Sequence, residues 1–244
     1  MGSNGSIDGA ASGPALPRQA VTRLLVVLAA ATGCLDVFCV TQLGGFFASV
    51  VTGNLVRSGH ALVALDARPL VTGATAVSGY AVGVAGGTLP LRRAVPGWRL
   101  RTEVVMALEA VVLVAVAAGW WASDGRPARA TALTLLFGAA AATGMQGIVT
   151  IGSGIPGANT TYLTGSLTTV VQGVVLDPHR LFTGTGGIVR LLGLFAGAVL
   201  GSATLRVAPL LAPAVAAALV LVVVSVAVSI GRRTARSTSE RQQG

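Results

Sequence analysis

Long apolar runs dominate this sequence and restrict it to a fold that spans a membrane. Continuous runs of this kind predict helices, because the strands of a membrane β-barrel are short and alternate apolar with polar residues. Most of the runs approach the ~20 residues that a helix needs to cross a hydrocarbon core about 30 Å thick. Only 10% of the residues are charged, against about 25% in soluble domains. We therefore expect an all-α integral membrane protein. The runs cover residues 24–40, 70–89, 104–121, 130–142, 188–205 and 212–230.

The ends of the chain differ from the runs between them. Residues 1–19 are rich in Gly, Ser, Ala and Pro, which predicts a disordered tail, and residues 233–244 form a short basic tail. The net charge of +9 comes from arginines spread over loops and tails beside the apolar runs. This placement indicates topology signals and contacts with lipid headgroups. We expect the lipid bilayer as a partner and no nucleic acid.

A duplication divides the chain into two units. The phrase TGNL at 52–55 returns as TGSL at 164–167, an offset of 112 residues, and LDARPLVTG at 65–73 returns as LDPHRLFTG at 176–184, an offset of 111 residues. A nearly constant offset over this length predicts an internal repeat. The predicted units are residues 20–125 and 126–232.

The repeated phrase lies in a short apolar segment, 46–56, that cannot cross a membrane by itself. The segment either forms a half-helix or re-entrant hairpin, or it continues through Arg57 and His60 as a full span. The first case gives about six spans in two inverted three-helix repeats, and the second gives parallel halves of four spans. With a cytoplasmic N-terminus, both cases place eleven loop and tail arginines inside and five outside. The most basic short loop, 92–101, is cytoplasmic only with six spans, which we favour, with both termini in the cytoplasm.

Two motif-bearing stretches resemble a known family. GCLDVFCVTQLGGFFASVVTGNLV in the first unit and ATGMQGIVTIGSGIPGANTTYLTGSLT in the second are similar to the YoaK family of bacterial membrane proteins, a domain family of unknown function. The pattern differs at Gly147, where the family would have Asn. The resemblance implies a multi-pass protein of the bacterial inner membrane and supplies no substrate. The matching residues are Gly33, Asp36, Thr52, Gly53, Asn54, Gly144, Gln146, Thr160, Thr161, Thr164 and Gly165.

The paired polar phrases suggest a transport site. A helix broken inside the membrane exposes backbone groups that lipid cannot satisfy, so such breaks occur inside the protein or beside a watery cavity. We expect Gly53 and Gly165 to permit the breaks. Paired broken helices in inverted repeats are typical of secondary transporters. The alternative is that the small polar residues only pack helices together, in a non-transporting scaffold or partner subunit. The predicted substrate-binding residues are Asp36, Thr52, Gly53, Asn54, Gln146, Thr160, Thr161, Thr164, Gly165 and Ser166.

Three charged residues lie inside apolar runs, namely Asp36, Glu109 and Arg190. Charges inside a membrane are costly and indicate function. Asp36 is predicted to be a proton- or cation-coupling site, or the counter-ion of Arg190. Glu109 is the other candidate charge partner, or else a snorkelling or lipid-facing residue.

Two glycine ladders recur in the two units and predict close packing of helices. Each has a glycine at every fourth residue. Asp66 precedes an apolar run and is predicted to cap the N-terminus of a helix. The ladders are Gly79, Gly83, Gly87 and Gly193, Gly197, Gly201.

The sequence has no pattern of a catalytic or metal site. It has neither a His-Glu-x-x-His helix nor a Gly-x-Ser-x-Gly elbow, and His60 and His179 lie in predicted loops. Cys34 and Cys39 are on different faces of one predicted helix, which argues against a disulfide or a metal pair. We expect no enzyme, cofactor or metal, and a small solute as ligand. The solute, transport direction, coupling ion and formation of a homo-oligomer are left open.

Overall fold

The chain folds into a bundle of long helices. The computed structural model describes residues 15–92, 94, 97–155, 160, 164–176 and 185–243. Within these residues there is no strand, which agrees with the predicted all-α class. The helices are α1 (Arg18–Gln42), α2 (Val51–Val63), α3 (Ala67–Leu91), α4 (Leu100–Ala122), α5 (Arg129–Gly152), α6 (Thr164–Leu176), α7 (Thr185–Val207) and α8 (Ala212–Gln243), with a 3₁₀ turn, η2 (Pro209–Leu211), before the last.

Six helices in the described part of the chain are long and apolar enough to cross a membrane, which confirms the predicted number of spans. They are α1, α3, α4, α5, α7 and α8. The predicted cap of α3 is also present, because the Asp66 carboxylate accepts a hydrogen bond of 3.0 Å from the backbone N–H of Arg68. The last helix runs on to Gln243, so the basic tail predicted from residue 233 is part of α8. That stretch contains no Gly or Pro before the final residue, and nothing in its sequence stops a helix.

The two units pack against each other in the same way. Helix α1 of the first unit lies along α7 of the second, and its repeat equivalent α5 lies along α3. The glycine ladders form both contacts, as predicted. A Cβ atom added at Gly79 would lie 2.6 Å from the carbonyl oxygen of Phe137, and one added at Gly193 would lie 2.9 Å from that of Val26. Phe137 and Val26 are equivalent at the repeat offset of 111 residues, so the two contacts are related by the duplication.

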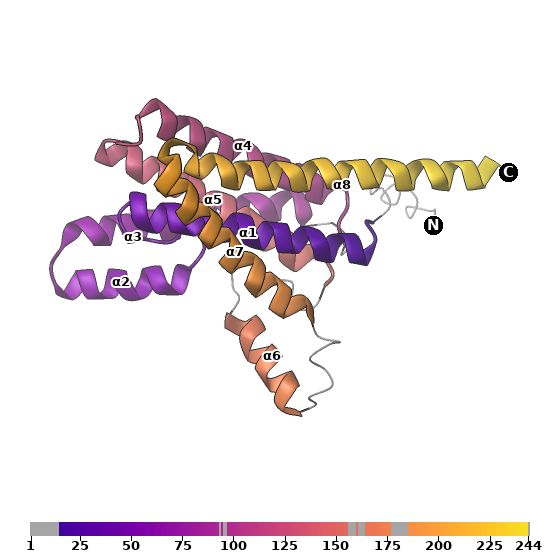
Figure 1. Ribbon diagram of the computed structural model, residues 1–244, viewed down its shortest axis with the longest axis horizontal. Coiled ribbons are helices and arrows are strands. Elements are labelled where there is room, and N and C mark those ends of the chain that lie inside the picture. The colour runs from indigo at the N-terminus through magenta and orange to yellow at the C-terminus, as the bar shows by residue number, and fades with distance from the viewer. Residues whose placement is uncertain are drawn as a thin grey trace, which may run out of the picture.

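The halves have opposite orientations. Along α1 and α7 the contacts advance together, from Val26 with Gly193 to Cys34 with Gly201, so these helices are parallel. Helices α3 and α5 are parallel by the same criterion. Figure 1 shows both termini at one end of the bundle and the α2–α3 connection at the other, so α1 and α3 run in opposite directions. Helix α5 therefore runs opposite to α1, and the units form an inverted repeat.

The short helix α2 does not span the bundle. Its 13 residues cover about 20 Å at 1.5 Å per residue, and it packs along α3. Ser49, just before α2, is hydrogen-bonded to Asp36, which lies six residues before the end of α1. The chain has therefore turned back into the bundle after α1. We call residues 43–50 the re-entrant segment. The alternative of a full span through Arg57 and His60 is wrong.

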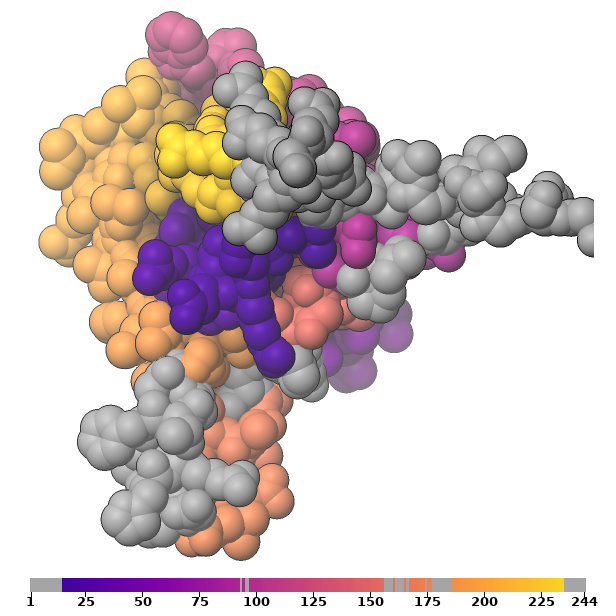
Figure 2. Space-filling view, turned by 90° about the vertical axis from the view of Figure 1, so that its right-hand side faces the viewer, coloured from indigo at the N-terminus to yellow at the C-terminus, as the bar shows by residue number. Residues whose placement is uncertain are grey.

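The two short helices are placed differently. Helix α2 lies along α3, whereas its equivalent α6 projects beyond the other helices and contacts α7 over a short stretch (Figures 1 and 2). The long helices thus follow the repeat closely, and the short ones break it.

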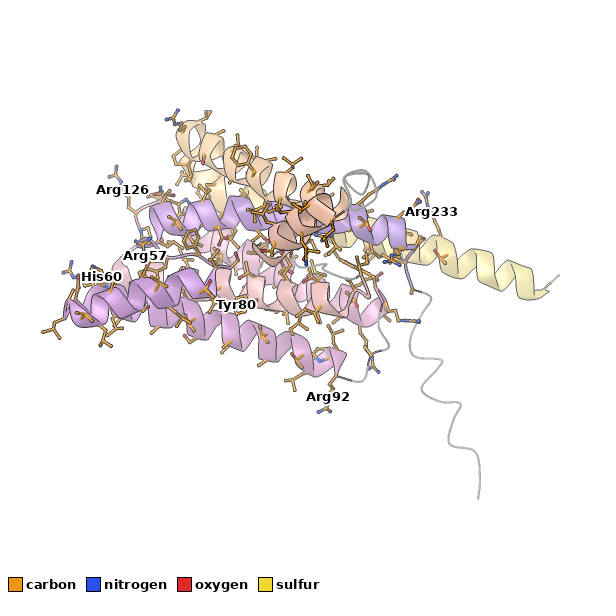
Figure 3. All side chains as sticks on the ribbon, turned by 90° about the horizontal axis from the view of Figure 1, so that it is seen from below. Arg57, His60, Tyr80, Arg92, Arg126 and Arg233 are labelled. Carbon is orange, nitrogen blue, oxygen red and sulfur yellow. The ribbon has the colours of Figure 1, made fainter. Side chains whose placement is uncertain are left out.

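Charged side chains mark the two ends of the bundle. Figure 3 shows Arg57, His60 and Arg126 at one end, and Arg92 and Arg233 toward the end from which the chain termini extend. The basic loop that joins α3 to α4 therefore lies at the same end as the termini, as the six-span arrangement requires.

We expect the end with the termini to face the cytoplasm, because it holds the most basic short loop. A single cysteine at Gln19, on this end, should react with an impermeant thiol reagent only after cells are permeabilised. One at Ala64, on the opposite end, should react in intact cells. Both positions are exposed, and the background lacks Cys34 and Cys39. Reaction of the Gln19→Cys variant in intact cells would contradict this orientation.

Candidate functional site

The helix break in the first unit lies upstream of the repeated phrase. Helix α1 ends at Gln42, and Gly44 and Gly45 follow with φ angles of 98° and 85°. Glycine adopts this left-handed backbone readily, whereas other residues rarely do. Gly53 instead lies inside α2, so the prediction that Gly53 forms the break was wrong. Gly165 is likewise the second residue of α6.

Gly45→Ala is expected to destabilise the protein, whereas Gly53→Ala should not. Alanine at Gly45 adopts a left-handed conformation at a cost of about 1–2 kcal/mol, and its Cβ would lie 2.8 Å from the Arg57 guanidinium. At Gly53 the nearest atom is a Val50 methyl at 3.3 Å, and alanine favours a helix over glycine by about 1 kcal/mol. Thermal unfolding in detergent measures both variants. A lower unfolding temperature for Gly53→Ala than for Gly45→Ala would contradict this assignment of the break.

Two polar side chains satisfy the backbone of the re-entrant segment from opposite sides. The Asn54 amide oxygen accepts a 2.9 Å bond from the N–H of Phe47, and its Nδ2 donates a 2.8 Å bond to the Phe47 carbonyl. The Thr143 hydroxyl, on α5 of the other unit, donates a 2.8 Å bond to the carbonyl of Ala48. Backbone that would be costly in lipid is thus paired inside the protein. Asn54, predicted to bind substrate, is 1% exposed and holds the backbone instead.

Asp36 makes the third tie to this segment. Its carboxylate accepts a 2.9 Å hydrogen bond from the N–H of Ser49 and another from the Ser49 hydroxyl. Both donors stabilise the charged form of a carboxylate. Asp36 is 7% exposed, and it also lines a cavity. Unlike Asn54, it joins the re-entrant segment to an open space.

The second unit has a related tie, made by Gln146. Its Nε2 donates hydrogen bonds of 2.7 Å to the Thr160 hydroxyl and 2.8 Å to the Thr32 hydroxyl. Thr32 and Thr143 are repeat equivalents, 111 residues apart. Each therefore lies on the first helix of its unit and engages the polar segment of the opposite unit, Thr143 directly and Thr32 through Gln146. The structure thus brings together Gln146 and Thr160 from the predicted site, and adds Thr32 and Thr143.

A cavity of about 580 Å³ lies between α1, the re-entrant segment, α2, α6 and α7. Asp36, Ser49 and Thr52 line it from the first unit, and Leu167 lines it from the second. Leu167 and Leu55 close the two repeated phrases, so both phrases reach the region of this cavity through neighbouring residues. Thr161 and the side chains of Thr164 and Ser166 lie outside the described residues. The predicted meeting of all the polar side chains in one cavity therefore remains a prediction.

The other intramembrane charges lie away from Asp36. Arg190 precedes Gly193, which packs against Val26 of the parallel helix α1. Arg190 is therefore level with residue 23 of α1, about 20 Å along the helix from Asp36. The two residues do not form the ion pair that the sequence suggested. Arg190 is 4% exposed.

Glu109 is buried in α4 and is 1% exposed, so it neither faces lipid nor snorkels. Its Oε2 atom has no hydrogen-bond partner among the described residues. Helix α4 packs against α5 and α8, and Glu109 does not line the cavity at Asp36. Its predicted role as a charge partner is not supported by any contact in the described part of the chain.

Several site residues were missed from the sequence. Gly44 and Gly45 form a Gly-Gly pair directly after an apolar run, which is a turn signal. Thr32 and Thr143 belong to the repeat, and their conserved register within the chain could have marked them. Ser49 had no distinguishing signal. Cys34 and Cys39 are free and buried, as expected, and the described residues contain no cluster of three metal-ligating side chains.

Comparison with known proteins identifies a family without a described activity. A family model described as "Protein of unknown function (DUF1275)" matches residues 24–227. This range covers both units, and the match is consistent with the resemblance to the YoaK family. No curated protein and no solved structure matches the chain.

Proposed function

We propose that this chain, which belongs to the DUF1275 family of proteins of unknown function, transports a small solute across the bacterial inner membrane. The cavity at Asp36 carries the proposal. It lies where a re-entrant segment of one inverted unit meets α6 and α7 of the other. Secondary transporters bind their substrates at such an interface between inverted repeats.

The different positions of the short helices support alternating access. Helix α2 packs along α3, whereas α6 stands away from most of α7. In a protein with inverted repeats, a second state arises when the two units exchange their arrangements. In that state α6 would pack along α7 and α2 would move outward. The cavity would then be remodelled at both of its borders, and a bound solute would face the other side.

Asp36 is the proposed coupling residue. The ionised carboxylate accepts from both the N–H and the hydroxyl of Ser49. A protonated carboxyl is itself a donor and has less acceptor capacity. Proton binding at Asp36 therefore weakens its tie to the re-entrant segment, which links the charge in the cavity to the position of α2.

The alternative of a non-transporting scaffold explains the ties made by Asn54, Thr143 and Gln146, since these residues only satisfy buried groups. It does not explain why an ionisable residue lines an open cavity at the junction of the units. Burying a carboxylate in a membrane protein is costly and is usually retained for function.

The test is a flux measurement that assumes no substrate. Proteoliposomes are loaded with an isotope-labelled extract of small bacterial metabolites, and solutes that leave are identified by mass spectrometry in the presence and absence of a pH gradient. We expect at least one solute to leave faster than from protein-free liposomes. If no solute does so under either condition, the transport proposal is wrong and the scaffold reading stands.

Asp36→Asn should reduce this flux by at least about tenfold, because a hydrogen bond to a charged group is worth about 1.5–3 kcal/mol. The asparagine keeps the size of the side chain, so the yield of monodisperse protein should change little. Flux and gel-filtration yield are measured on the same preparation. Wild-type flux at every pH tested would reduce Asp36 to a structural residue.

A further inference from the structure

The cavity at Asp36 holds one carboxylate and no fixed cation. Its described lining contains neither Arg nor His, and its other polar side chains are hydroxyls, including those of Thr41 and Ser202. Arg190 is about 20 Å away along α1. Arg57 and His60 line a separate cavity of about 340 Å³ between α2 and α3.

The positive end of α2 does not cancel this charge. A helix N-terminus carries about half a positive charge, and Asp36 meets it through Ser49, two residues before the first residue of α2. A full negative charge therefore exceeds the dipole beside it. The cavity stays net negative whenever Asp36 is ionised.

Most of the cavity wall is apolar. Val37 and Val40 from α1 face Leu191 and Leu194 from α7 across it. A bare metal ion needs several converging oxygen ligands, and a volume of about 580 Å³ is the size of a site for an organic molecule. The wall thus suits a molecule with a large apolar body, and the carboxylate suits one positive charge on it.

We infer that this cavity binds a monovalent organic cation with an apolar body, in exchange for a proton on Asp36. The inference rests on the proposed function and names the substrate class of the same site. An ionised carboxylate without a partner is costly in low dielectric. The carboxyl therefore holds either a proton or the cation: as the cation enters, the O–H bond breaks and the proton leaves to water, and no other bond changes. Exchange of this kind makes the protein a proton–cation antiporter.

Binding is tested on the purified protein in detergent, with two probes of the same shape and opposite charge. Tetraphenylphosphonium is the cation and tetraphenylborate the anion, and equilibrium dialysis against protein-free micelles corrects for partition into detergent. We expect saturable binding of the cation, at least about tenfold tighter than of the anion. Equal binding of both probes, tighter binding of the anion, or no binding would overturn the inference.

Proton exchange is tested by repeating the measurement over a range of pH. Cation affinity of the wild type should fall as pH falls, because protons compete for Asp36, and Asp36→Asn should bind weakly at every pH. Two other groups could titrate nearby: Cys39 on the same helix is buried, and His60 on α2 faces the other cavity. His60→Asn and Cys39→Ala should therefore keep the pH dependence. Loss of it in either variant would overturn the assignment to Asp36.

Two further variants make the result independent of how well Asp36→Asn folds. Val40→Phe fills the cavity and leaves Asp36 in place, so it should lose cation binding. Glu103→Gln removes a carboxylate on the first turn of α4, outside the cavity, and should bind like the wild type. Wild-type affinity in Val40→Phe would overturn the site.

The binding and flux experiments fail separately. Flux of a neutral or anionic solute together with no cation binding would overturn the inference and leave the transport proposal standing. Cation binding without flux of any solute would support the site and overturn transport. Uptake of tetraphenylphosphonium into proteoliposomes driven by a pH gradient, and absent in Asp36→Asn, supports both.

Discussion

Gly83→Val is expected to abolish the folded bundle, whereas Gly86→Val on the same helix should leave it intact. A Cβ added at Gly83 would overlap the backbone carbonyl of Ala141 on α5, and one added at Gly86 would meet no atom within 4 Å. Overpacking costs about 1–3 kcal/mol where side chains yield. Here the obstacle is backbone, so α3 and α5 must separate along their length, and we expect about 3 kcal/mol or more.

The duplication supplies an internal check on this prediction. Gly197 meets the carbonyl of Ala30 on α1 as Gly83 meets that of Ala141, so Gly197→Val should fail in the same way. The measurement is the yield of monodisperse protein and its unfolding temperature in detergent. Similar unfolding temperatures for Gly83→Val and Gly86→Val would show that the ladders do not set the distance between the helices.

Asn54→Ala is expected to destabilise the protein by about 2–4 kcal/mol, because it leaves the N–H and carbonyl of Phe47 unpaired at about 1–3 kcal/mol each. Both groups lie on the re-entrant segment, where lipid and packed side chains offer no substitute partner. The loss should also free the segment to move, so a cysteine at Val50 should react faster with a thiol reagent than in the unmodified protein.

Thr52→Ala is the matched control for Asn54→Ala. Thr52 lies two residues earlier on the same helix and is exposed, so its removal should shift the unfolding temperature little. Unfolding temperature and the reaction rate at Val50 are measured together. An Asn54→Ala protein as stable as Thr52→Ala would mean that Asn54 does not hold the re-entrant segment.

The two functions of the polar residues separate in the structure. Asn54, Thr143 and Gln146 are buried and spend their hydrogen bonds on protein groups. Asp36 combines such a bond with a place on a cavity wall. Substitutions of the first group should therefore act mainly on stability, and substitutions of Asp36 mainly on flux.

Hydropathy and repetition alone determined the architecture. Apolar runs of helical length can only be satisfied in a bilayer by helices, so the class and the number of spans were predictable. The offset shared by the two units was visible because the duplication left Thr32 and Thr143 in register. The glycine ladders were readable too, since only close helix contact makes a glycine at every fourth residue useful.

The location of the break and the composition of the site depended on tertiary structure. A Thr-Gly-Asn phrase and a Gly-Gly pair both permit a break, and local sequence does not decide between them. The break falls at Gly44 and Gly45 because Asn54, inside α2, must reach back to Phe47. Partners such as Thr143 and Ala48 are 95 residues apart, and only the packing of inverted units brings them together. The separation of Asp36 from Arg190 likewise follows from the parallel alignment of α1 and α7, a relation between helices that no single helix encodes.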